Sequence, residues 1–324
     1  MINSMNKKVT INDIATIANV AKSTVSRYLN GGSVSEHTRL KIDRIVAQYN
    51  YTPNTFAQSL KQQKNHTIGV IVPRLDSIAQ SDMLRGLDDL NKDDTFLIVN
   101  AYQDAKRELA AIEKLHSQNV GGIILLTANL TDEIRDVLKA SPLPIVIQGQ
   151  DEPNFHRVIM DDLAAGKAVG QYIKTLAPKN VLLLNVDTKI DQAVGHDRFV
   201  GIKAALAETP HQEIITDFKL DTAKADSYQA MQTDDFDLVI GATDRIVVGA
   251  MQSAFALKQH PKFIGFGQSF FSETVSPNLT SFEFNFYETG KQLYRLFLKV
   301  RDDKPVDVQR VIMNGHLVVR ESTE

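Results

Sequence analysis

Residues 9–32 read VTINDIATIANVAKSTVSRYLNGG and predict two short helices joined by a tight turn. Thr10 suits the N-cap of the first helix, and Asp13 completes a capping-box arrangement three residues later. Asn19 stands at the turn, where asparagine tolerates a left-handed backbone better than most residues do. This spacing is typical of a helix-turn-helix. The apolar residues that would hold the two helices together are Ile11, Ile14, Ala15, Ile17, Ala18, Val20, Val25 and Leu29.

A third helix is predicted from an N-cap at Ser35 to about Tyr49. Its apolar residues, which we expect to face the first two helices, are Leu40, Ile42, Ile45 and Val46. An ordinary three-helix bundle would show a similar pattern. The apolar spacing alone therefore leaves both alternatives open.

The polar face of the second helix favours the helix-turn-helix. It carries short hydroxyl and basic side chains and has no acidic residue between Val20 and Gly32. The start of this helix enters the major groove of DNA in helix-turn-helix proteins. Side chains of these types can reach phosphates and base edges there, whereas carboxylates would be repelled. The residues on this face are Lys22, Ser23, Thr24, Ser26 and Arg27.

The charge of the chain is divided unevenly. Residues 1–66 carry nine Lys or Arg against three Asp or Glu, and the remainder carries 27 basic against 36 acidic residues. A small basic end on a larger acidic body indicates a polyanion-binding module joined to something else. Chance clustering is the alternative.

Composition bounds the remaining choices. The chain has 324 residues, of which 43% are hydrophobic, so a single compact domain is not expected. It has no cysteine, which excludes disulfides and thiolate metal sites. Its start lacks the apolar segment of a secretory signal, and no apolar run approaches the length of a membrane span. We therefore expect a cytoplasmic protein without membrane contact.

The segment after the third helix is predicted to be a short helix and a linker. Pro53 can begin a helix, and residues 54–61 would form about two turns, too few to be stable alone. The polar sequence KQQKNH follows at residues 61–66. A marginal helix in this place is a candidate for folding upon binding.

From residue 67 onward, apolar runs alternate with amphipathic stretches. This alternation predicts mostly parallel sheets with helical crossovers, and the length suggests two such units with a ligand between them at the carboxyl ends of the strands. Seven runs are predicted strands: 67–72, 95–99, 121–126, 144–148, 180–186, 237–242 and 262–267. No dinucleotide fingerprint, phosphate loop, nucleophile elbow or His/Glu metal spacing is present, so we expect no cofactor, no metal and no enzyme activity.

The motifs VTINDIATIANVAKSTVSRYLNGG, VSEHTRLKIDRIVAQYNYTPNTFAQSL and TIGVIVP resemble the lactose-repressor (LacI/GalR) family of bacterial transcription regulators, and the resemblance covers nearly the whole chain. It implies a homodimer that binds double-stranded operator DNA. Lys22 and Ser23 match base-reading positions, and Leu60 matches the leucine that wedges into a central base step. The chain departs from the family at Asn19 and Thr52. The implied DNA-contacting residues are Thr10, Lys22, Ser23, Thr24, Ser26, Arg27, Asn30, Asn54, Ala57 and Leu60.

The family also implies a domain plan. Residues 1–52 would bind DNA, residues 53–66 would form a hinge helix and linker, and residues 67–324 would form a two-lobed, periplasmic-binding-protein-like α/β body that binds a sugar and dimerises. Lobe 1 would take about 67–160 and 287–312, and lobe 2 about 161–286 and 313–324. Since no further heptad follows Glu324, we expect a dimer rather than a tetramer.

The implied sugar site combines family positions with strand ends. Arg198 matches the pocket arginine, whose fork suits vicinal hydroxyls, although a surface ion pair with Asp197 or Asp191 is the alternative. Asp244 serves equally well as a helix cap. Phe218 could be an ordinary core residue. Gln268 stands where the family usually has an aspartate. The full expected set is Asp76, Ser77, Gln148, Asp161, Arg198, Phe218, Thr243, Asp244, Gln268 and Phe286, with Phe282, Phe284 and Phe286 on one strand face.

The sequence therefore predicts a repressor of a sugar-utilisation operon that a small sugar releases from DNA. The segments PRLDS, GFG and GQ resemble sucrose-operon repressors of Gram-positive bacteria, with trehalose repressors second. A sugar-binding transport or receptor protein without DNA function is the alternative from another class, and an enzyme of doubly wound fold is a third. Sequence alone leaves the sugar, the operator and the sign of regulation open.

Overall fold

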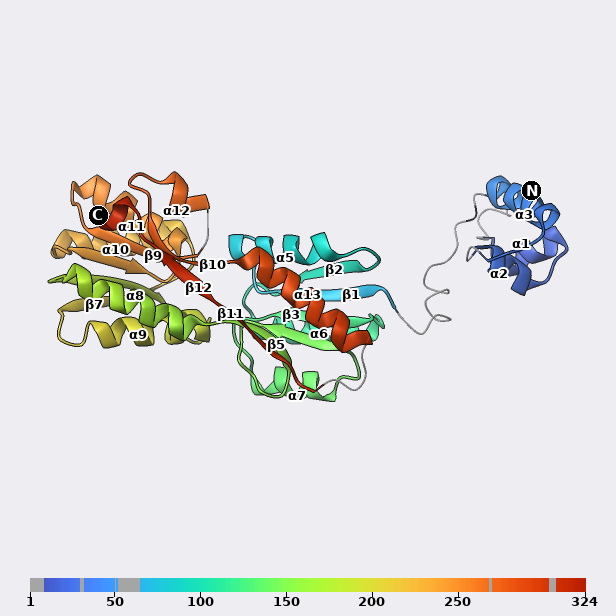
Figure 1. The fold of residues 1–324 in the computed structure, drawn as a ribbon, viewed down its shortest axis with the longest axis horizontal. Coiled ribbons are helices and arrows are strands. Elements are labelled where there is room, and N and C mark those ends of the chain that lie inside the picture. The colour runs from blue at the N-terminus through green and yellow to red at the C-terminus, as the bar shows by residue number, and fades with distance from the viewer. Residues whose placement is uncertain (1–8, 30–31, 50, 52–64, 268–269, 303–306) are drawn as a thin grey trace, which may run out of the picture. The chain divides into compact units, whose positions relative to one another are not determined.

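A computed structural model describes residues 9–29, 32–49, 51, 65–267, 270–302 and 307–324. The chain forms two compact units, Met1–Asn65 and His66–Glu324 (Figure 1). The expected hinge helix lies outside the described residues, and so do five of the expected site residues, which are Asn30, Asn54, Ala57, Leu60 and Gln268.

The described part of the first unit contains helices α1 (Ile11–Ala18), α2 (Lys22–Leu29) and α3 (Glu36–Gln48). The predicted capping box is confirmed: the Asp13 amide donates to Thr10 Oγ1 at 3.4 Å, and the Thr10 amide donates to Asp13 Oδ2 at 2.8 Å. Asn19 has φ +48° and ψ 51°, the left-handed conformation predicted for the turn. Ser35 caps α3 as expected.

The core of the first unit, the helix-turn-helix head, contains fewer residues than the sequence predicted. Ile14, Val25 and Ile42 are fully buried where the three helices meet. Ile17 and Leu40 were expected inside, but they are 45% and 56% exposed. Each helical residue advances about 100°, so Leu40 lies about 200° around α3 from Ile42 and faces away from the core.

The second unit contains two six-stranded sheets with strand orders β11-β5-β4-β3-β1-β2 and β12-β10-β9-β8-β6-β7. The paired strands are parallel except β10 and β12, which are antiparallel. The strands are β1 (Thr67–Val72), β2 (Thr95–Asn100), β3 (Gly122–Leu126), β4 (Ile145–Gln148), β5 (His156–Met160), β6 (Val181–Val186), β7 (His211–Thr216), β8 (Leu238–Gly241), β9 (Lys262–Phe266), β10 (Thr280–Phe284), β11 (Arg310–Met313) and β12 (Gly315–Val318).

All seven apolar runs singled out in the sequence form strands. The central strands β3, β4, β6 and β8 are buried along their whole length, because helices cover both faces of each sheet. The helices are α5 (Ile78–Leu90), α6 (Ala105–Ser117), α7 (Asp132–Ala140), α8 (Asp162–Leu176), α9 (Arg198–Ala205), α10 (Leu220–Thr233), α11 (Asp244–Leu257), α12 (Phe270–Thr274) and α13 (Phe286–Asp302), with a π-helical turn at Ala193–Asp197 and a 3-10 turn at Glu321–Thr323.

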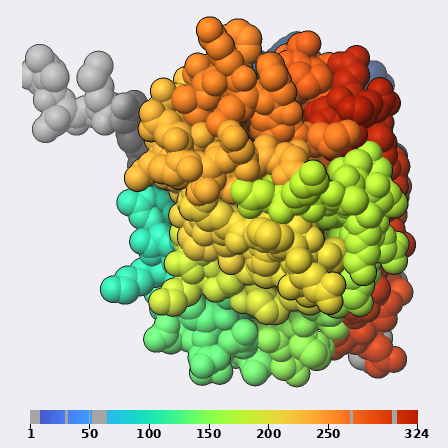
Figure 2. All heavy atoms as spheres, turned by 90° about the vertical axis from the view of Figure 1, so that its left-hand side faces the viewer, coloured from blue at the N-terminus to red at the C-terminus, as the bar shows by residue number. Residues whose placement is uncertain are grey.

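Each sheet with its helices is a lobe. Lobe 1 holds the first sheet with α5, α6, α7 and α13, and lobe 2 holds the second sheet with α8 to α12. Among the described residues the chain passes between the lobes from β5 to α8, from β10 to α13 and from β11 to β12 (Figure 1). In the space-filling view, segments coloured yellow-green to orange, which belong to lobe 2, cover most of the face shown (Figure 2).

The second passage corrects one prediction. We expected Phe282, Phe284 and Phe286 to share a strand face, but β10 ends at Phe284 and Phe286 begins α13. The change of conformation occurs at Asn285, whose Oδ1 accepts the Glu288 amide at 2.9 Å. This bond satisfies an amide of the first turn of α13, so the helix begins directly after the strand.

Candidate functional site

The polar face of α2 lies on the surface. Lys22, Ser23 and Arg27 are exposed, while Val25 on the opposite side is fully buried. Thr24 and Ser26 are partly buried beside them. None of the residues of α2 is acidic. The side chains expected to meet DNA are therefore accessible on one face of a helix that is anchored by its apolar face.

The position of α2 is fixed at its C-terminal end. The Tyr28 hydroxyl donates to Asp43 of α3, and this hydrogen bond raises the pKa of Tyr28. The Gly32 amide donates to the carbonyl oxygen of Arg27 at 2.8 Å. A Cβ at Gly32 would lie 2.6 Å from Arg27 Cγ, so glycine permits this close return of the chain. Both contacts hold the helix that carries Arg27.

A cavity of about 150 Å³ lies between the two lobes of the second unit. That is roughly ten times the volume that admits one water molecule, so a small organic ligand fits. Seven of the expected residues line it: Ser77 and Gln148 from lobe 1, Arg198, Phe218, Thr243 and Asp244 from lobe 2, and Phe286 from the passage between them. Asp76 and Asp161 are not in the lining.

Arg198 is held rigidly in the cavity wall. Its Nε and Nη2 donate to Asp162 Oδ1 at 2.9 and 2.6 Å, and its Nη1 donates to the Ala242 carbonyl. Its guanidinium carbon lies 4.7 Å from the centre of the Phe266 ring. These contacts use three of the five N–H groups of the guanidinium, so others remain for a ligand. The alternative of a surface ion pair does not hold, because Arg198 is only 4% exposed.

Asp161 and Asp162 divide two roles. Asp161 Oδ1 accepts the Ala164 amide at 2.9 Å and caps α8. Asp162, which is 5% exposed, lines the cavity and pairs with Arg198. The sequence indicated a carboxylate at the end of this strand, but the residue in the cavity is the next one along the chain.

Thr243 and Asp244 divide roles in the same way. Thr243 Oγ1 accepts the Ile246 amide at 3.4 Å and is the cap of α11. Asp244 is 2% exposed, and its Oδ1 accepts the Ser281 hydroxyl at 2.7 Å. Gly265 makes room for it, since a Cβ there would lie 2.3 Å from Asp244 Oδ1. Asp244 is thus a fixed acceptor in the lining.

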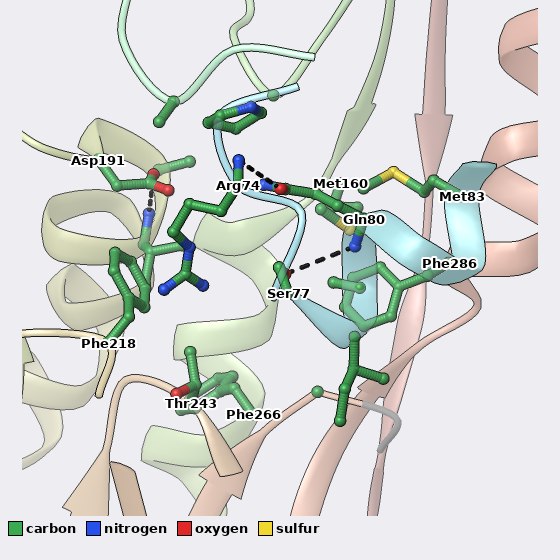
Figure 3. Close-up of a pocket in the computed structure, with 18 of the residues that line it drawn as sticks. Arg74, Ser77, Gln80, Met83, Met160, Asp191, Phe218, Thr243, Phe266 and Phe286 are labelled. Atoms are coloured by element: carbon green, nitrogen blue, oxygen red, sulfur yellow. Dashed lines mark hydrogen bonds between the residues drawn. The ribbon is translucent and has the colours of Figure 1, made fainter. Parts of the chain in front are cut away.

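Arg74 is one of several cavity residues that were not expected from the sequence, as are Asp162, Asp191 and Arg245. Arg74 follows β1, and its side chain extends into the middle of the cavity (Figure 3). Its guanidinium carbon lies 4.3 Å from the centre of the Phe218 ring. Its buried Nε has no hydrogen-bond partner in the described structure. The segment PRLDS was singled out in the sequence, but for its aspartate and serine rather than for this arginine.

Two carboxyl groups near the cavity are poised to keep a proton. Burial raises the pKa of Asp191 to about 7, although its carboxylate accepts the Val194 amide at 3.1 Å. Burial also raises the pKa of Glu108 to about 7, against the opposing effect of the Thr127 hydroxyl, which donates to it at 2.9 Å. Asp191 and Thr127 line the cavity, and Glu108 lies behind Thr127.

The described residues contain neither a metal site nor a membrane-spanning helix. Within the described ranges, no group of three or more His, Asp or Glu side chains is placed to hold a metal ion. Of the helices described, none combines the length and the apolar character that a membrane crossing requires.

Comparisons with known proteins agree with this architecture. Residues 10–54 match the family model of bacterial regulatory proteins, lacI family, and residues 68–276 match that of a periplasmic binding protein domain. The chain is 35% identical over 290 residues to the sucrose operon repressor of Staphylococcus xylosus, covering 86% of this chain and 90% of the relative.

Two solved structures share the fold. The lac repressor dimer bound to operator and the anti-inducer ONPF is similar with a TM-score of 0.83 at 22% identity, covering 98% of this chain and 99% of that chain. The complex of the transcriptional regulator CelR with cellobiose is similar with a TM-score of 0.70 at 22% identity, covering 97% and 99%.

A helix-turn-helix head joined to a two-lobed ligand-binding body defines a DNA-binding transcription regulator with a sugar-binding effector domain. The chain belongs to the LacI family of bacterial regulatory proteins. The predicted fold class is thereby confirmed. Members of this family are regulators and not enzymes, which decides against the doubly wound enzyme.

Proposed function

We propose that the protein represses a sugar-utilisation operon in the cytoplasm and leaves its operator when a small sugar binds. It acts as a homodimer on a roughly palindromic operator. One observation carries this proposal: both lobes supply residues to the same cavity, for example Ser77 from lobe 1 and Arg198 from lobe 2. A ligand in such a cavity interacts differently with different lobe arrangements, as a change of state requires.

The proposed DNA contacts lie on α2. Lys22, Ser23 and Arg27 read base edges in the major groove, since all three are exposed at positions that follow the turn. Thr24 and Ser26 lie nearer the phosphates. Thr10 is exposed, and its hydroxyl donates to Asp13. We assign Thr10 a phosphate contact, for which its hydroxyl has to leave Asp13 or the residues beside it have to make the contact.

The proposed sugar contacts combine fixed donors and acceptors with aromatic faces. Arg198 and Asp162 present donors and acceptors side by side, which suits neighbouring hydroxyls. Phe218 and Phe286 supply apolar surface for a sugar ring. The 35% identity to a sucrose operon repressor favours a sucrose-type sugar. Gln148 and Asp244 also line the cavity and contact the sugar, whereas Asp76 lies outside the lining and acts indirectly through its ion pair with Arg245.

The free energy with which the sugar shifts the protein away from the DNA-bound arrangement cannot exceed the difference in its binding free energy for the two lobe arrangements. Moving a population from 99:1 to 1:99 requires a preference of roughly 5.5 kcal/mol. A ligand that bound both arrangements equally would release nothing, whatever its affinity.

Gel shifts on the DNA upstream of the chain's own gene test the proposal. We expect a specific complex that sucrose or a related sugar dissociates, and a rise in melting temperature with the same sugar. Sugar binding without any DNA complex would support the alternative of a transport or receptor protein. Absence of both would refute the proposed function.

A further inference from the structure

A buried carboxylate joins separate segments of lobe 1. Asp94 lies in the loop between α5 and β2, and its side chain is 1% exposed. Its Oδ1 accepts from Arg301 Nη1 at 2.8 Å and lies 2.8 Å from His66 Nδ1. Its Oδ2 accepts from the Tyr294 hydroxyl at 2.7 Å. We call Asp94, Arg301, Tyr294 and His66 the Asp94 cluster. It joins the middle and the end of α13 to the residue that precedes β1.

Asp94 is fixed in its position by charge and by its loop. Arg301, whose side chain is 12% exposed, donates to both carboxylate oxygens, at 2.8 and 2.7 Å. Moving the carboxylate away from these donors would leave a buried charge unpaired, which is costly. The loop is closed by Asn91, whose Nδ2 donates to the Asp94 carbonyl oxygen at 2.7 Å and whose Oδ1 accepts the Asp94 amide at 2.9 Å. Asp94 is therefore a fixed acceptor for the side chains that reach it.

His66 stands at the start of the second unit and at the end of the expected linker to the DNA-binding head. Its side chain is 45% exposed, although Nδ1 contacts the buried Asp94. Its carbonyl oxygen accepts the Thr95 amide at 2.7 Å. Two consecutive residues, Asp94 and Thr95, thus hold the point where β1 begins. A change in these bonds changes the course of the chain at the end of the linker.

The first residue of α13 lies at the cavity between the lobes. This residue, Phe286, lines the cavity, and α13 then runs along α5 (Figure 1). A Cβ at Gly86 of α5 would lie 2.0 Å from the Tyr287 carbonyl oxygen. A Cβ at Gly290 would lie 2.0 Å from the carbonyl oxygen of Met83. The two helices are in backbone contact and move as one body. Residues 286 to 301 of α13 span about 22 Å, at about 1.5 Å per residue.

We infer that the Asp94 cluster is a positioning site that couples the cavity to the start of β1. One helix lines the cavity with Phe286 and holds His66 through Asp94, so a displacement of α13 changes the bonds of His66. His66 has two discrete states, bound to Asp94 or turned into solvent, and its partial exposure permits both. The bound state belongs to the arrangement that binds the operator, and the effector favours the released state.

The members of the Asp94 cluster do not line the cavity. An effect of these residues on operator release therefore arises without contact to the effector. The inference rests on the proposed function and specifies which residues couple the effector cavity to the DNA-binding head.

Gel shifts and calorimetry on the full chain test the inference through a release ratio, which is the operator Kd with sugar divided by the operator Kd without sugar. The probes are sucrose, glucose, fructose and trehalose at millimolar concentrations. His66→Ala should weaken operator binding without sugar and lower the release ratio about fivefold or more. Its sugar affinity in the absence of DNA should change less than about twofold. His66→Asn, whose side-chain amide still donates to Asp94, should restore most of the release ratio.

Tyr294→Phe tests the connection from the side of α13. It removes the hydroxyl that donates to Asp94 and keeps the ring contacts with Phe96 and Phe297, whose centroids lie 5.5 and 6.5 Å away. The release ratio should fall as it does in His66→Ala. The double variant should lose little more than either single variant, because both changes break the same series of contacts.

Each substitution has a matched control within lobe 1. Tyr287→Phe removes another hydroxyl of α13, which donates to Asp89 of α5. His116→Ala removes a histidine whose Nε2 lies 2.7 Å from Ser141 Oγ. Both controls should keep the release ratio of the parent. A role in stability alone would lower the melting temperature and leave the release ratio unchanged.

Several results overturn the inference. An unchanged release ratio in His66→Ala and Tyr294→Phe would remove the coupling role while leaving the proposed function intact. An equal loss in Tyr287→Phe and His116→Ala would show a general loss of stability. Full additivity in the double variant would show that the two residues act independently. A parent chain that none of the sugars releases from its operator would contradict the proposed function itself, and the inference with it.

Discussion

Arg245 at the start of α11 holds Asp76 in the loop after β1, so a helix of lobe 2 is tied to lobe 1. Arg245 Nη1 lies 3.1 Å from Asp76 Oδ2, and Nη2 lies 2.7 Å from the Asp76 carbonyl oxygen. The cation–π contact between Arg74 of lobe 1 and Phe218 of lobe 2 lies in the same cavity. These contacts stabilise the observed arrangement of the lobes. A ligand that changes this arrangement must therefore break or shift them.

The first prediction concerns this tie. Asp76→Ala should lower the sugar concentration for half-release of the operator by up to about fivefold, because a partly exposed ion pair contributes at most about 1 kcal/mol. Titrating sugar into the operator complex in a gel shift measures it. Asp82→Ala is the control, since it breaks an ion pair within α5 alone. If Asp76→Ala leaves the sugar concentration for half-release unchanged, the Arg245–Asp76 ion pair is equally strong in the DNA-bound and the sugar-bound arrangement of the lobes.

The second prediction concerns the recognition face. Arg27→Ala should weaken binding to the operator by about 1–3 kcal/mol and reduce discrimination against scrambled DNA, while the fold persists because Arg27 is exposed. Competition gel shifts at fixed salt measure both. The control Arg39→Ala removes an exposed arginine of α3 that lies 4.0 Å from Asp43. If both variants lose affinity equally for all sequences, Arg27 contacts phosphates and not bases.

Much of the head and of both sheets was predictable from local patterns. The turn at Asn19 and the caps at Thr10 and Ser35 depend on neighbouring residues, so the sequence contains their cause. The strands could be predicted because central parallel strands, which are buried on both faces, appear in the sequence as continuous apolar runs. Ser77 and Gln148 could be placed in the cavity because ligands bind at the carboxyl ends of parallel strands.

The details of the cavity were less predictable for a physical reason. Asp161 and Asp162 differ only in which side of a helix boundary they occupy, and such boundaries are uncertain by more than one residue. Arg74 enters the cavity beside Phe218, which lies far away in the sequence on the other lobe. No local pattern records such a contact, because it arises only when the two lobes meet.

The third prediction concerns the buried ion pair. Arg198→Ala should lower the free energy of unfolding by about 3–5 kcal/mol, because it leaves Asp162 as an unpaired buried charge, and it should also abolish release by sugar. Chemical denaturation of the single and double variants measures it. Arg198→Ala with Asp162→Ala should recover part of the stability but not the response to sugar. Equal losses in the single and double variants would show that packing, not the unpaired charge, determines the cost.

The fourth prediction concerns pH. Burial raises the pKa of Glu108 from near 4.5 to about 7, so the folded state binds its proton more tightly than the unfolded state does. The contribution of Glu108 to stability is therefore fully present below pH 4.5 and is lost as the pH rises through about 7, where the cost reaches about 3 kcal/mol.

Glu108→Gln mimics the protonated carboxyl and can still accept from Thr127. We expect the variant and the parent to have similar free energies of unfolding near pH 5. At pH 8 the variant should be more stable by up to about 3 kcal/mol. Urea denaturation at both pH values measures the difference, and Asp191 titrates alike in the two proteins. Glu113→Gln, at an exposed position of the same helix, should leave the pH profile unchanged. Parallel profiles for Glu108→Gln and the parent would show that Glu108 is ionised in the folded protein at neutral pH, because hydrogen bonding then outweighs the desolvation of its carboxylate.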